Sequence, residues 1–226
     1  PAYEPIILAR KPLIGTVAEN VQAHGTGALN IDGCRVQHSE IISGRLNLEG
    51  KHEGWQRPWM ADERNVRERL QGAYDRANQM GRWPANIVTD GSDEVLAGFP
   101  KTGPANVRGS EDKDVPASTW ALGRTGIMPR GINDSGGSAA RFFYTAKADA
   151  NDRIGSKHPT VKPVDLMRWL CRLVTPPGGT ILDPFAGTGT TGEAAFYEGF
   201  NAILIEREPE YVADIERRMK LVMAGP

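Results

Sequence analysis

The sequence predicts an α/β fold of the kind that binds nucleotides, and two apolar runs followed by an acid predict it. Ile181-Leu182 and residues 202–205 each read as a short buried parallel strand. A glycine-rich turn and a helical pattern through 194–196 lie between them, and Gly199 is placed to end that helix. The second run ends on Glu206. Strand, glycine turn, helix, strand and acid form the layout of one nucleotide-binding βαβ half.

The glycine turn has properties that suit a ligand lying across the strand end. Gly187 and Gly189 offer backbone without side chains, so a ligand can approach closely. The helix that follows offers free N–H groups and a positive dipole at its first turn. Glu206 stands at the tip of the next strand, where a carboxylate can accept from both ribose hydroxyls of an adenosine.

The nature of that adenosine ligand follows from the residues around the turn. Residues 187–192 match the dinucleotide pattern G-x-G-x-x-G, but Asp183-Pro184-Phe185 comes first, and its carboxylate would repel a diphosphate. No Walker lysine follows the glycines. An acid at this strand end suits a cationic ligand, such as the amino group or sulfonium of S-adenosylmethionine. The alternatives are a tight turn with no ligand and an NAD-dependent oxidoreductase.

Two segments resemble motifs of a known family. Asp-Pro-Phe-Ala-Gly-Thr-Gly-Thr-Thr at 183–191 is similar to motif I of the amino-group DNA methyltransferases, which modify adenine N6 or cytosine N4. His-Pro-Thr-Val-Lys-Pro at 158–163 is similar to motif X. Motif X before motif I is the order of the β class. The opening residues 1–12 resemble the segment that follows the catalytic half in phage-type members.

The resemblance implies a Rossmann-like, S-adenosylmethionine-dependent methyltransferase fold with an inserted, loop-rich recognition lobe. It implies a cofactor-binding set made of Asp183, Pro184, Phe185, Gly187, Thr188, Gly189, Thr190, Glu206, His158, Thr160 and Lys162. The motif I residues would surround the methionine end, with hydroxyls from the two threonines nearby. Glu206 would take the ribose, and the motif X residues would flank the methionine carboxylate. Three structural alternatives stay open: Phe185 fills core, His158 is a turn residue, and Glu206 is a solvated strand end.

The catalytic motif that the resemblance implies is absent from this sequence. Methylating an exocyclic amine requires the base to be extruded and its amine to be hydrogen-bonded. In the family an Asp/Ser-Pro-Pro-Tyr/Phe motif does this, and Pro176-Pro177 lies between Thr175 and Gly178, so it does not match. We therefore assign no catalytic residue. We expect the C-terminal part of a longer methyltransferase, with a split enzyme or a degenerate, binding-only relative as alternatives.

Composition fits a globular protein in a reducing cytoplasm. The 226 residues are 39% hydrophobic and carry a net charge of −1, so bulk charge does not favour nucleic-acid binding. No apolar run is long enough to cross a membrane, and no signal-peptide pattern is present. Cys34 and Cys171 lie far apart and outside any metal-ligand spacing, so no metal site is predicted.

The pattern of elements predicts three regions. Residues 1–36 are expected to join the core sheet, 37–140 to form a target-recognition insertion, and 141–226 to bind the cofactor. One helix is expected to begin at Thr16, with Glu19 three residues on as in a capping box. Further helices are expected at 62–80, at 91–99, at 163–174 with Leu166, Leu170 and Leu173 facing inward, and from Pro209 with a charged outer face. Further strands are expected at 5–10, 83–90 and 141–147. A long loop is expected within 100–140.

Together these observations predict a site-specific DNA methyltransferase acting on adenine N6, of the restriction–modification kind. Cytosine N4 is the alternative target, and a non-catalytic DNA- or cofactor-binding fragment is the alternative class. The predicted partners are double-stranded DNA and either the missing N-terminal catalytic half or a second copy of the chain, with no membrane.

Overall fold

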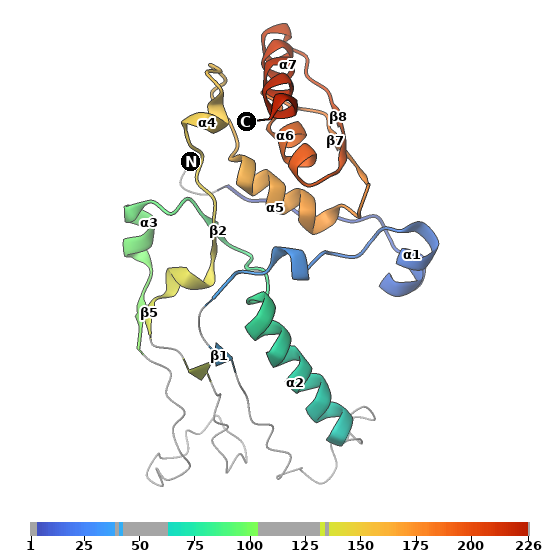
Figure 1. Ribbon diagram of the computed structural model, residues 1–226, viewed down its shortest axis with the longest axis vertical. Helices are drawn as coiled ribbons and strands as arrows, with labels where there is room; N and C mark the ends of the chain where they lie inside the picture. Colours follow the sequence, from blue (N-terminus) through green and yellow to red (C-terminus); the bar gives the residue numbers. More distant parts are fainter. Residues whose placement is uncertain (1–3, 39–40, 43–62, 104–131, 134–135, 226) are drawn as a thin grey trace. The chain divides into compact units, whose positions relative to one another are not determined.

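A computed structural model of the protein describes residues 4–38, 41–42, 63–103, 132–133 and 136–225 (Figure 1). The chain divides into two compact units. Unit 1 comprises Pro1–Cys34 and Thr145–Pro226, and unit 2 comprises Arg35–Tyr144. Among the described residues, no helix is long and apolar enough to cross a membrane.

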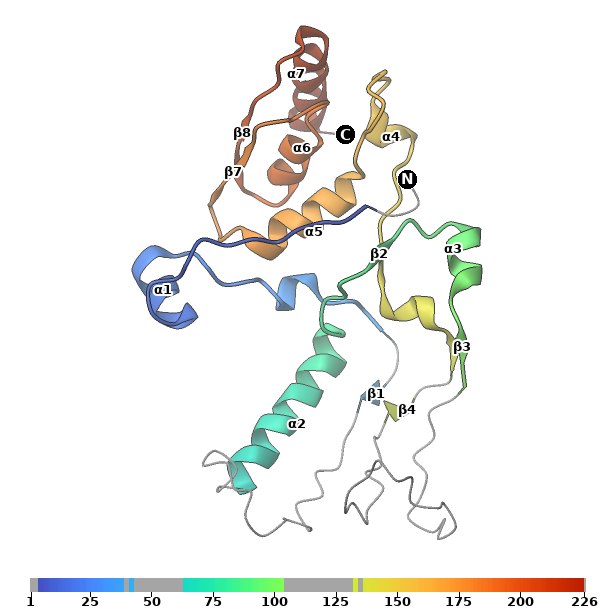
Figure 2. The same ribbon diagram turned by 180° about the vertical axis from the view of Figure 1, so that it is seen from behind.

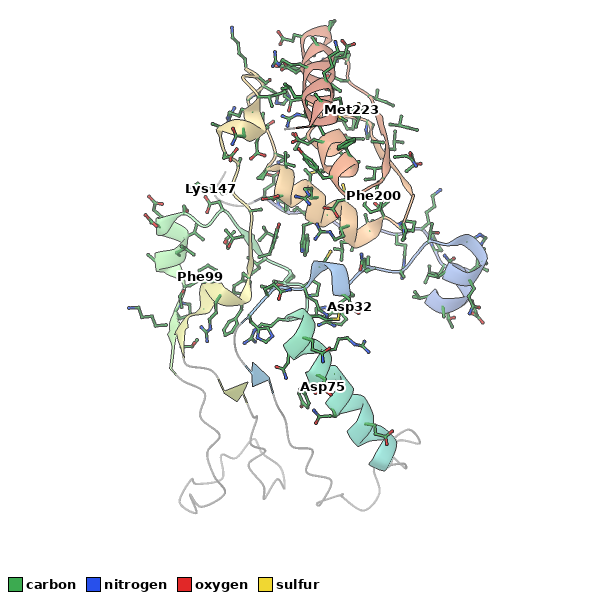
Figure 3. The ribbon with its side chains drawn as sticks, viewed as in Figure 1. Asp32, Asp75, Phe99, Lys147, Phe200 and Met223 are labelled. Carbon is green, nitrogen blue, oxygen red and sulfur yellow. The ribbon has the colours of Figure 1, made fainter. Side chains whose placement is uncertain are left out.

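The centre of unit 1 is a parallel βαβ element. Strand β7 (Thr180–Asp183) pairs in parallel with β8 (Asn201–Leu204), and α6 (Thr190–Tyr197) connects them. Both ribbon views show the two strands side by side with α6 beside them (Figures 1 and 2). The side chain of Phe200 lies in the loop between α6 and β8 (Figure 3). The predicted strand–turn–helix–strand order is confirmed, and with it the α/β class.

Small residues let α6 approach β8 closely. Ala194 and Ala195 are fully buried on this helix. A Cβ atom built on Gly192 would lie 2.6 Å from Cδ1 of Leu204, closer than real Cβ contacts. The third glycine of the turn pattern therefore serves helix–strand packing, which is one of the roles that glycines have in this layout.

Helix α5 (Val164–Val174) packs against both α6 and the short 3₁₀ helix η1 (Asp32–Cys34). The indole Nε1–H of Trp169 donates to the carbonyl of Cys34 at 3.2 Å. Arg168 and Arg172 both pair with the carboxylate of Glu198, at 2.9 and 2.6 Å. The predicted inward face of Leu166, Leu170 and Leu173 is only half-buried. Trp169 and Cys171 are the buried residues of α5, and η1 packs against Trp169.

The remaining helices of unit 1 are α1 (Val17–His24), α4 (Ala150–Arg153) and α7 (Pro209–Ala224). Thr16 and Glu19 form the predicted capping box of α1. Helix α7 starts at Pro209 as predicted, and Met223 lies on its last turn (Figure 3). The strand predicted at 5–10 is wrong, since residues 4–13 contain no strand and Ile7 is exposed.

One face of the β7–β8 pair carries exposed apolar side chains. Leu182 and Ile203 are register partners, with 59% and 55% of their surfaces exposed. Ile205 continues this exposed series just beyond β8. Parallel strands are normally covered on both faces, so this face is unusual.

Unit 2 consists of one long helix and short strand pairs. Helix α2 (Glu63–Met80) confirms the predicted helix, and α3 (Asp93–Gly98) confirms the shorter one after Ser92. Asp75 lies on α2, and Phe99 follows α3 (Figure 3). The strands form antiparallel pairs of β1 (Ile41–Ile42) with β4 (Ile132–Asn133) and of β3 (Lys101–Thr102) with β5 (Gly137–Ser138). Of the strand predicted at 83–90, only β2 (Val88–Thr89) forms.

Side chains from residues 35–38 satisfy the C-terminal carbonyls of α2. Arg35 donates to the carbonyl of Gly81 at 3.1 Å, and Gln37 donates to that of Met80 at 3.2 Å. The Nε2 atom of His38 lies 2.9 Å from the carbonyl oxygen of Ala77. The last turn of a helix leaves carbonyls without helical partners, so these contacts fix the helix end.

Residues 139–145 form a short 3₁₀ helix followed by a short strand. The strand predicted at 141–147 is largely wrong, because 3₁₀ helix η3 (Ala139–Phe142) occupies its first part and only β6 (Tyr144–Thr145) is extended. Ser138 caps η3 through its hydroxyl, which accepts from the N–H of Ala140. The loop predicted within 100–140 lies mostly outside the described residues.

Candidate functional site

The glycine turn follows β7 directly and leads into α6. Gly187 and Gly189 have φ angles of +53° and +78°, which side-chain-bearing residues rarely adopt. The N–H of Gly189 donates to the carbonyl of Ala186 at 2.8 Å. Pro184 and Phe185 are both exposed at the start of the turn. With 87% of its surface exposed, Phe185 fills no core, so that alternative is excluded.

The carboxylate of Asp183 is held at the end of β7 by two donors. The N–H of Phe185 donates to Oδ1 at 3.0 Å, and the hydroxyl of Thr191 donates to Oδ2 at 2.5 Å. Each carboxylate oxygen has a second lone pair, so both can still accept from a ligand. The acid is therefore fixed in position and retains acceptor capacity at the turn.

Glu206 links the end of β8 to the glycine turn. Its Oε2 accepts from the N–H of Gly187 at 2.8 Å, and its Oε1 accepts from the N–H groups of Arg207 and Glu208 at 2.7 and 2.9 Å. The N–H of Glu208 has the largest effect and lowers the pKa of Glu206; loss of hydration opposes it, and the N–H groups of Gly187 and Arg207 lower the pKa further. Glu206 is thus ionised at neutral pH and tied to the turn, which argues against a solvated strand end.

Residues 158–162 bring one side chain beside the turn. The ring of His158 lies 4.5 Å from that of Tyr211 on α7, and a Cβ atom on Gly187 would lie 3.4 Å from His158 Nε2. His158 also closes a local turn, since its Nδ1 accepts from the N–H of Thr160 at 3.2 Å. Both interpretations of His158 therefore agree with the structure. Lys162 pairs with Glu4.

The two threonines of the turn are placed differently from the prediction. Thr188 and Thr190 are buried, and their hydroxyl oxygens lie 3.5 Å apart. The carbonyl of Thr188 accepts from Nε of Arg218 at 2.8 Å. A ligand on the outer side of the turn would meet backbone atoms of these residues before their hydroxyls.

Sequence reasoning missed Thr191, Tyr211 and Arg218, which contact Asp183, His158 and Thr188 respectively. Arg218 was counted with the charged outer face of α7, yet it is completely buried. Its spacing of seven residues from Tyr211 places both on one face of the helix, and this could have signalled a shared role.

The geometry defines a class of protein. A side-chain-free turn at the carboxyl end of a parallel strand, with an ionised acid at the tip of the next strand, is the arrangement of a nucleotide-binding βαβ half. The second acid, Asp183, is the last residue of β7, directly before the turn, which suits a ligand that carries positive charge beside its nucleoside.

Comparison with known proteins then specifies the family. Residues 53–217 match the N6/N4 DNA methylase family. This match covers most of the chain, and the protein belongs to that DNA methylase family.

Individual relatives match shorter stretches. The Type II methyltransferase M.HinfI of Haemophilus influenzae is 40% identical over 83 residues, which are 36% of this chain and 23% of that protein. The crystal structure of an M1.HpyAVI–SAM complex shares 35% identity over 35% of this chain and 37% of that one, with a TM-score of 0.31. The cytosine-N4-specific PvuII DNA methyltransferase shares 28% identity over 34% and 30%, with a TM-score of 0.30. The chain therefore spans less than a quarter of its curated relative's length, and the family assignment rests on the 53–217 match.

Proposed function

We propose that this chain supplies the S-adenosylmethionine-binding part and the target-recognition region of a DNA methyltransferase that modifies adenine N6. The observation that carries the proposal is the ionised carboxylate of Glu206, hydrogen-bonded to the N–H of Gly187 at 2.8 Å across the glycine turn. Membership of the DNA methylase family supports the same activity. Cytosine N4 is the alternative target.

The residues of the turn fit S-adenosylmethionine. Glu206 would accept from the ribose hydroxyls with lone pairs that its backbone donors leave available. Asp183 would face the positively charged methionine end, and exposed Phe185 would cover it. His158 lies on the side of Gly187 where motif X is expected. The cofactor supplies the methyl group, while these residues bind and orient it.

The catalytic step is proposed to need residues from outside this chain. The sequence contains no Asp/Ser-Pro-Pro-Tyr/Phe motif that could hold an extruded base. The exposed face of Leu182 and Ile203 supports a covering partner, because parallel sheets bury both faces. We propose that the catalytic part of the methyltransferase covers this face and completes the sheet.

Unit 2 offers a surface that fits DNA. A hollow of about 640 Å³ is lined by Ala77, Arg82, Trp83, Pro84, Ala85, Asn86, Phe142 and Phe143. The guanidinium of Arg82 lies 4.5 Å from the centre of the Phe142 ring, and that of Arg35 lies 5.8 Å from the Trp83 ring. Trp83 is 66% exposed. Arginines attract phosphates and exposed aromatic faces stack on bases, so we propose that this hollow contacts DNA.

Methyl transfer from labelled S-adenosylmethionine to unmethylated DNA tests the proposed activity. We expect the chain alone to be inactive, and activity to appear with a catalytic segment from an N6/N4 relative. Digestion of the product to nucleosides would then show N6-methyladenine. Label in N4-methylcytosine would establish the alternative target, and activity from the chain alone would overturn the need for a catalytic partner.

The covering partner has its own test. Replacing Leu182 with Glu places a charge on an already exposed position, so the isolated chain should keep its thermal stability. The same variant should lose assembly with the catalytic segment in size-exclusion chromatography. Val95→Glu in unit 2 is the control, because Val95 is an exposed apolar residue that does not belong to this sheet. Normal assembly of Leu182→Glu would contradict the proposed interface.

A non-catalytic module is the second candidate function, and the absent catalytic motif favours it. Such a module would bind S-adenosylhomocysteine or DNA and remain inactive with every complementing segment. An NAD-dependent oxidoreductase would instead bind nicotinamide cofactors, and a fluorescence titration with NADH would reveal this.

A further inference from the structure

Arg218 of α7 is completely buried and contacts the glycine turn. Nε of Arg218 donates to the carbonyl of Thr188 at 2.8 Å, and Nη2 lies 3.4 Å from the hydroxyl of the same residue. Its Nη1 pairs with the carboxylate of Glu193 on α6. Its Nη2 also donates to the carbonyl of Asp152. One guanidinium thus joins the glycine turn, α6, α7 and the segment before motif X.

Burying a guanidinium is costly unless its donors are well paired, and an apolar side chain in its place is often as stabilising. The stability of the fold alone therefore does not explain why an arginine occupies position 218. The planar guanidinium has donors in a fixed fork, so it sets the direction of the groups that it binds. The group that it binds here is the carbonyl of Thr188, which lies between the two turn glycines.

Fixing this carbonyl fixes the peptides on either side of it. Gly187 and Gly189 both lack a side chain and adopt positive φ, so their peptides have the greatest freedom to rotate. The N–H of Gly187 holds Oε2 of Glu206, and the N–H of Gly189 closes the turn on Ala186. A continuous series of contacts therefore runs from Arg218 through the turn to the proposed ribose-binding acid.

The same helix holds the motif X segment in place. The hydroxyl of Ser156 donates to the carboxylate of Asp214, and the ring of His158 packs against Tyr211. Together with Arg218 and Asp152, these contacts fasten the segment at three points along α7. Residues 211, 214 and 218 are spaced three and four apart, so they share one face of the helix.

We propose that Arg218 is a positioning residue for cofactor binding, which acts by orienting the glycine turn so that Gly187 presents Glu206 to the ribose. The inference rests on the proposed S-adenosylmethionine site. It adds to that site a residue of α7 that lies 29 positions after Gly189. It also gives α7 a function beyond packing against α6.

Two variants separate the turn contact from the buried ion pair. Arg218→Lys keeps the charge beside Glu193 but loses the fork that holds Thr188 and Asp152. Glu193→Gln removes the ion pair and leaves the donor to Thr188 in place. We expect Arg218→Lys to weaken S-adenosylhomocysteine binding by about tenfold, and Glu193→Gln to change it by less than about threefold. Isothermal titration calorimetry on the full chain measures both.

A double-mutant cycle with Glu206 tests the mechanism. If Arg218 acts through Glu206, Arg218→Lys should have little further effect on affinity once Glu206 is Ala. If Arg218 only stabilised the fold, Arg218→Lys would lower Tm, and its effect on affinity would be absent or would simply add to that of Glu206→Ala. Arg172→Lys is the matched control, because Arg172 pairs with Glu198 away from the turn and should change Tm alone.

The outcomes are distinguishable. Wild type that binds S-adenosylhomocysteine, with Arg218→Lys unchanged or with fully additive losses, would overturn the role of Arg218 and leave the proposed site intact. Wild type that binds no S-adenosylhomocysteine would overturn the proposed site itself. If Arg218→Lys does not fold, hydrogen exchange of wild type takes its place: N–H groups of Gly187 and Gly189 that exchange as fast as those of an unstructured peptide would show that the turn is not held and would overturn the inference.

Discussion

The glycine turn of unit 1 and the hollow of unit 2 are assembled in different ways. The turn, with the aspartate before it, is one continuous segment, 183–191. The carboxylate of Asp183 is fixed by neighbours within the βαβ element, and the carbonyl of Thr188 is fixed by α7. The hollow instead combines residues 77–86 with residues 142–143. The arginine that lines it, Arg82, lies over the ring of Phe142, and so does the neighbouring Arg141. A site built from one segment should be sensitive to backbone changes, whereas a site built from exposed side chains should be sensitive to their removal.

The largest expected effect is at Gly189. Replacing it with Ala forces a left-handed conformation and places a Cβ atom 3.1 Å from Cγ1 of Ile215. We expect a loss of about 2–4 kcal/mol of stability from these two effects, together with loss of S-adenosylhomocysteine binding. Chemical denaturation followed by tryptophan fluorescence measures the stability.

Gly98→Ala in unit 2 is the control for this substitution. Gly98 ends α3 without positive φ, and its Cβ atom would meet nothing within 4 Å. We expect a change of less than about 1 kcal/mol, in the stabilising direction. Equal losses at the two glycines would remove the contrast between the units.

The next effect concerns alkaline pH and Cys171, which is buried on α5. Burial, aided by Glu198 and Asp183, raises the pKa of this thiol from 9.0 to about 11. The unfolded chain loses this proton first, so the thiol's contribution to stability is complete below pH 9 and falls as pH rises toward 11. The loss should reach about 2–3 kcal/mol.

The difference in unfolding free energy between wild type and Cys171→Ala isolates this contribution. The two proteins should differ most at pH 8, and the advantage of wild type should shrink steadily between pH 9 and pH 11. A difference that stays constant over this range would show that the thiol is not buried as described.

The smallest effect is expected at the hollow of unit 2. Trp83→Ala removes an exposed ring, so stability should hardly change while DNA affinity falls by about fivefold. The salt dependence of binding should stay the same, because the side chain is neutral. Arg82→Gln should instead lower the slope of log K against log salt by about one.

Fluorescence anisotropy with a labelled duplex at several salt concentrations measures both variants. Ile87→Ala is the control, since Ile87 is exposed in the same unit but does not line the hollow. If Ile87→Ala weakens binding as much as Trp83→Ala, the hollow is not the DNA surface.

The sequence predicted the βαβ element well because its signals are local. The apolar runs at 181–182 and 202–205, the glycines between them and Gly199 at the helix end all act within a few residues, and the structure confirms them. The capping box at Thr16 and Glu19 succeeded for the same reason. Propensity failed at 5–10, where no strand forms among the described residues, and for most of 141–147, where only β6 is extended and pairs with β2.

The site was predictable only in part. Two predicted residues do meet, because Glu206 accepts from the N–H of Gly187, whereas the carboxylate of Asp183 is held by Thr191, which was not predicted. Arg218 escaped notice because a charged residue on an amphipathic helix is normally exposed, and only the fold shows what covers it. The buried hydroxyls of Thr188 and Thr190 show the converse, since a motif position does not say which way its side chain points.

Calorimetric titration of the full chain with S-adenosylhomocysteine, for wild type and Glu206→Ala, tests the central claim most directly. We expect one site per chain and a loss of at least about tenfold in affinity for the variant, because hydrogen bonds to an ionised carboxylate are strong. Equal affinities for the two proteins, or heat from NADH instead of S-adenosylhomocysteine, would contradict it.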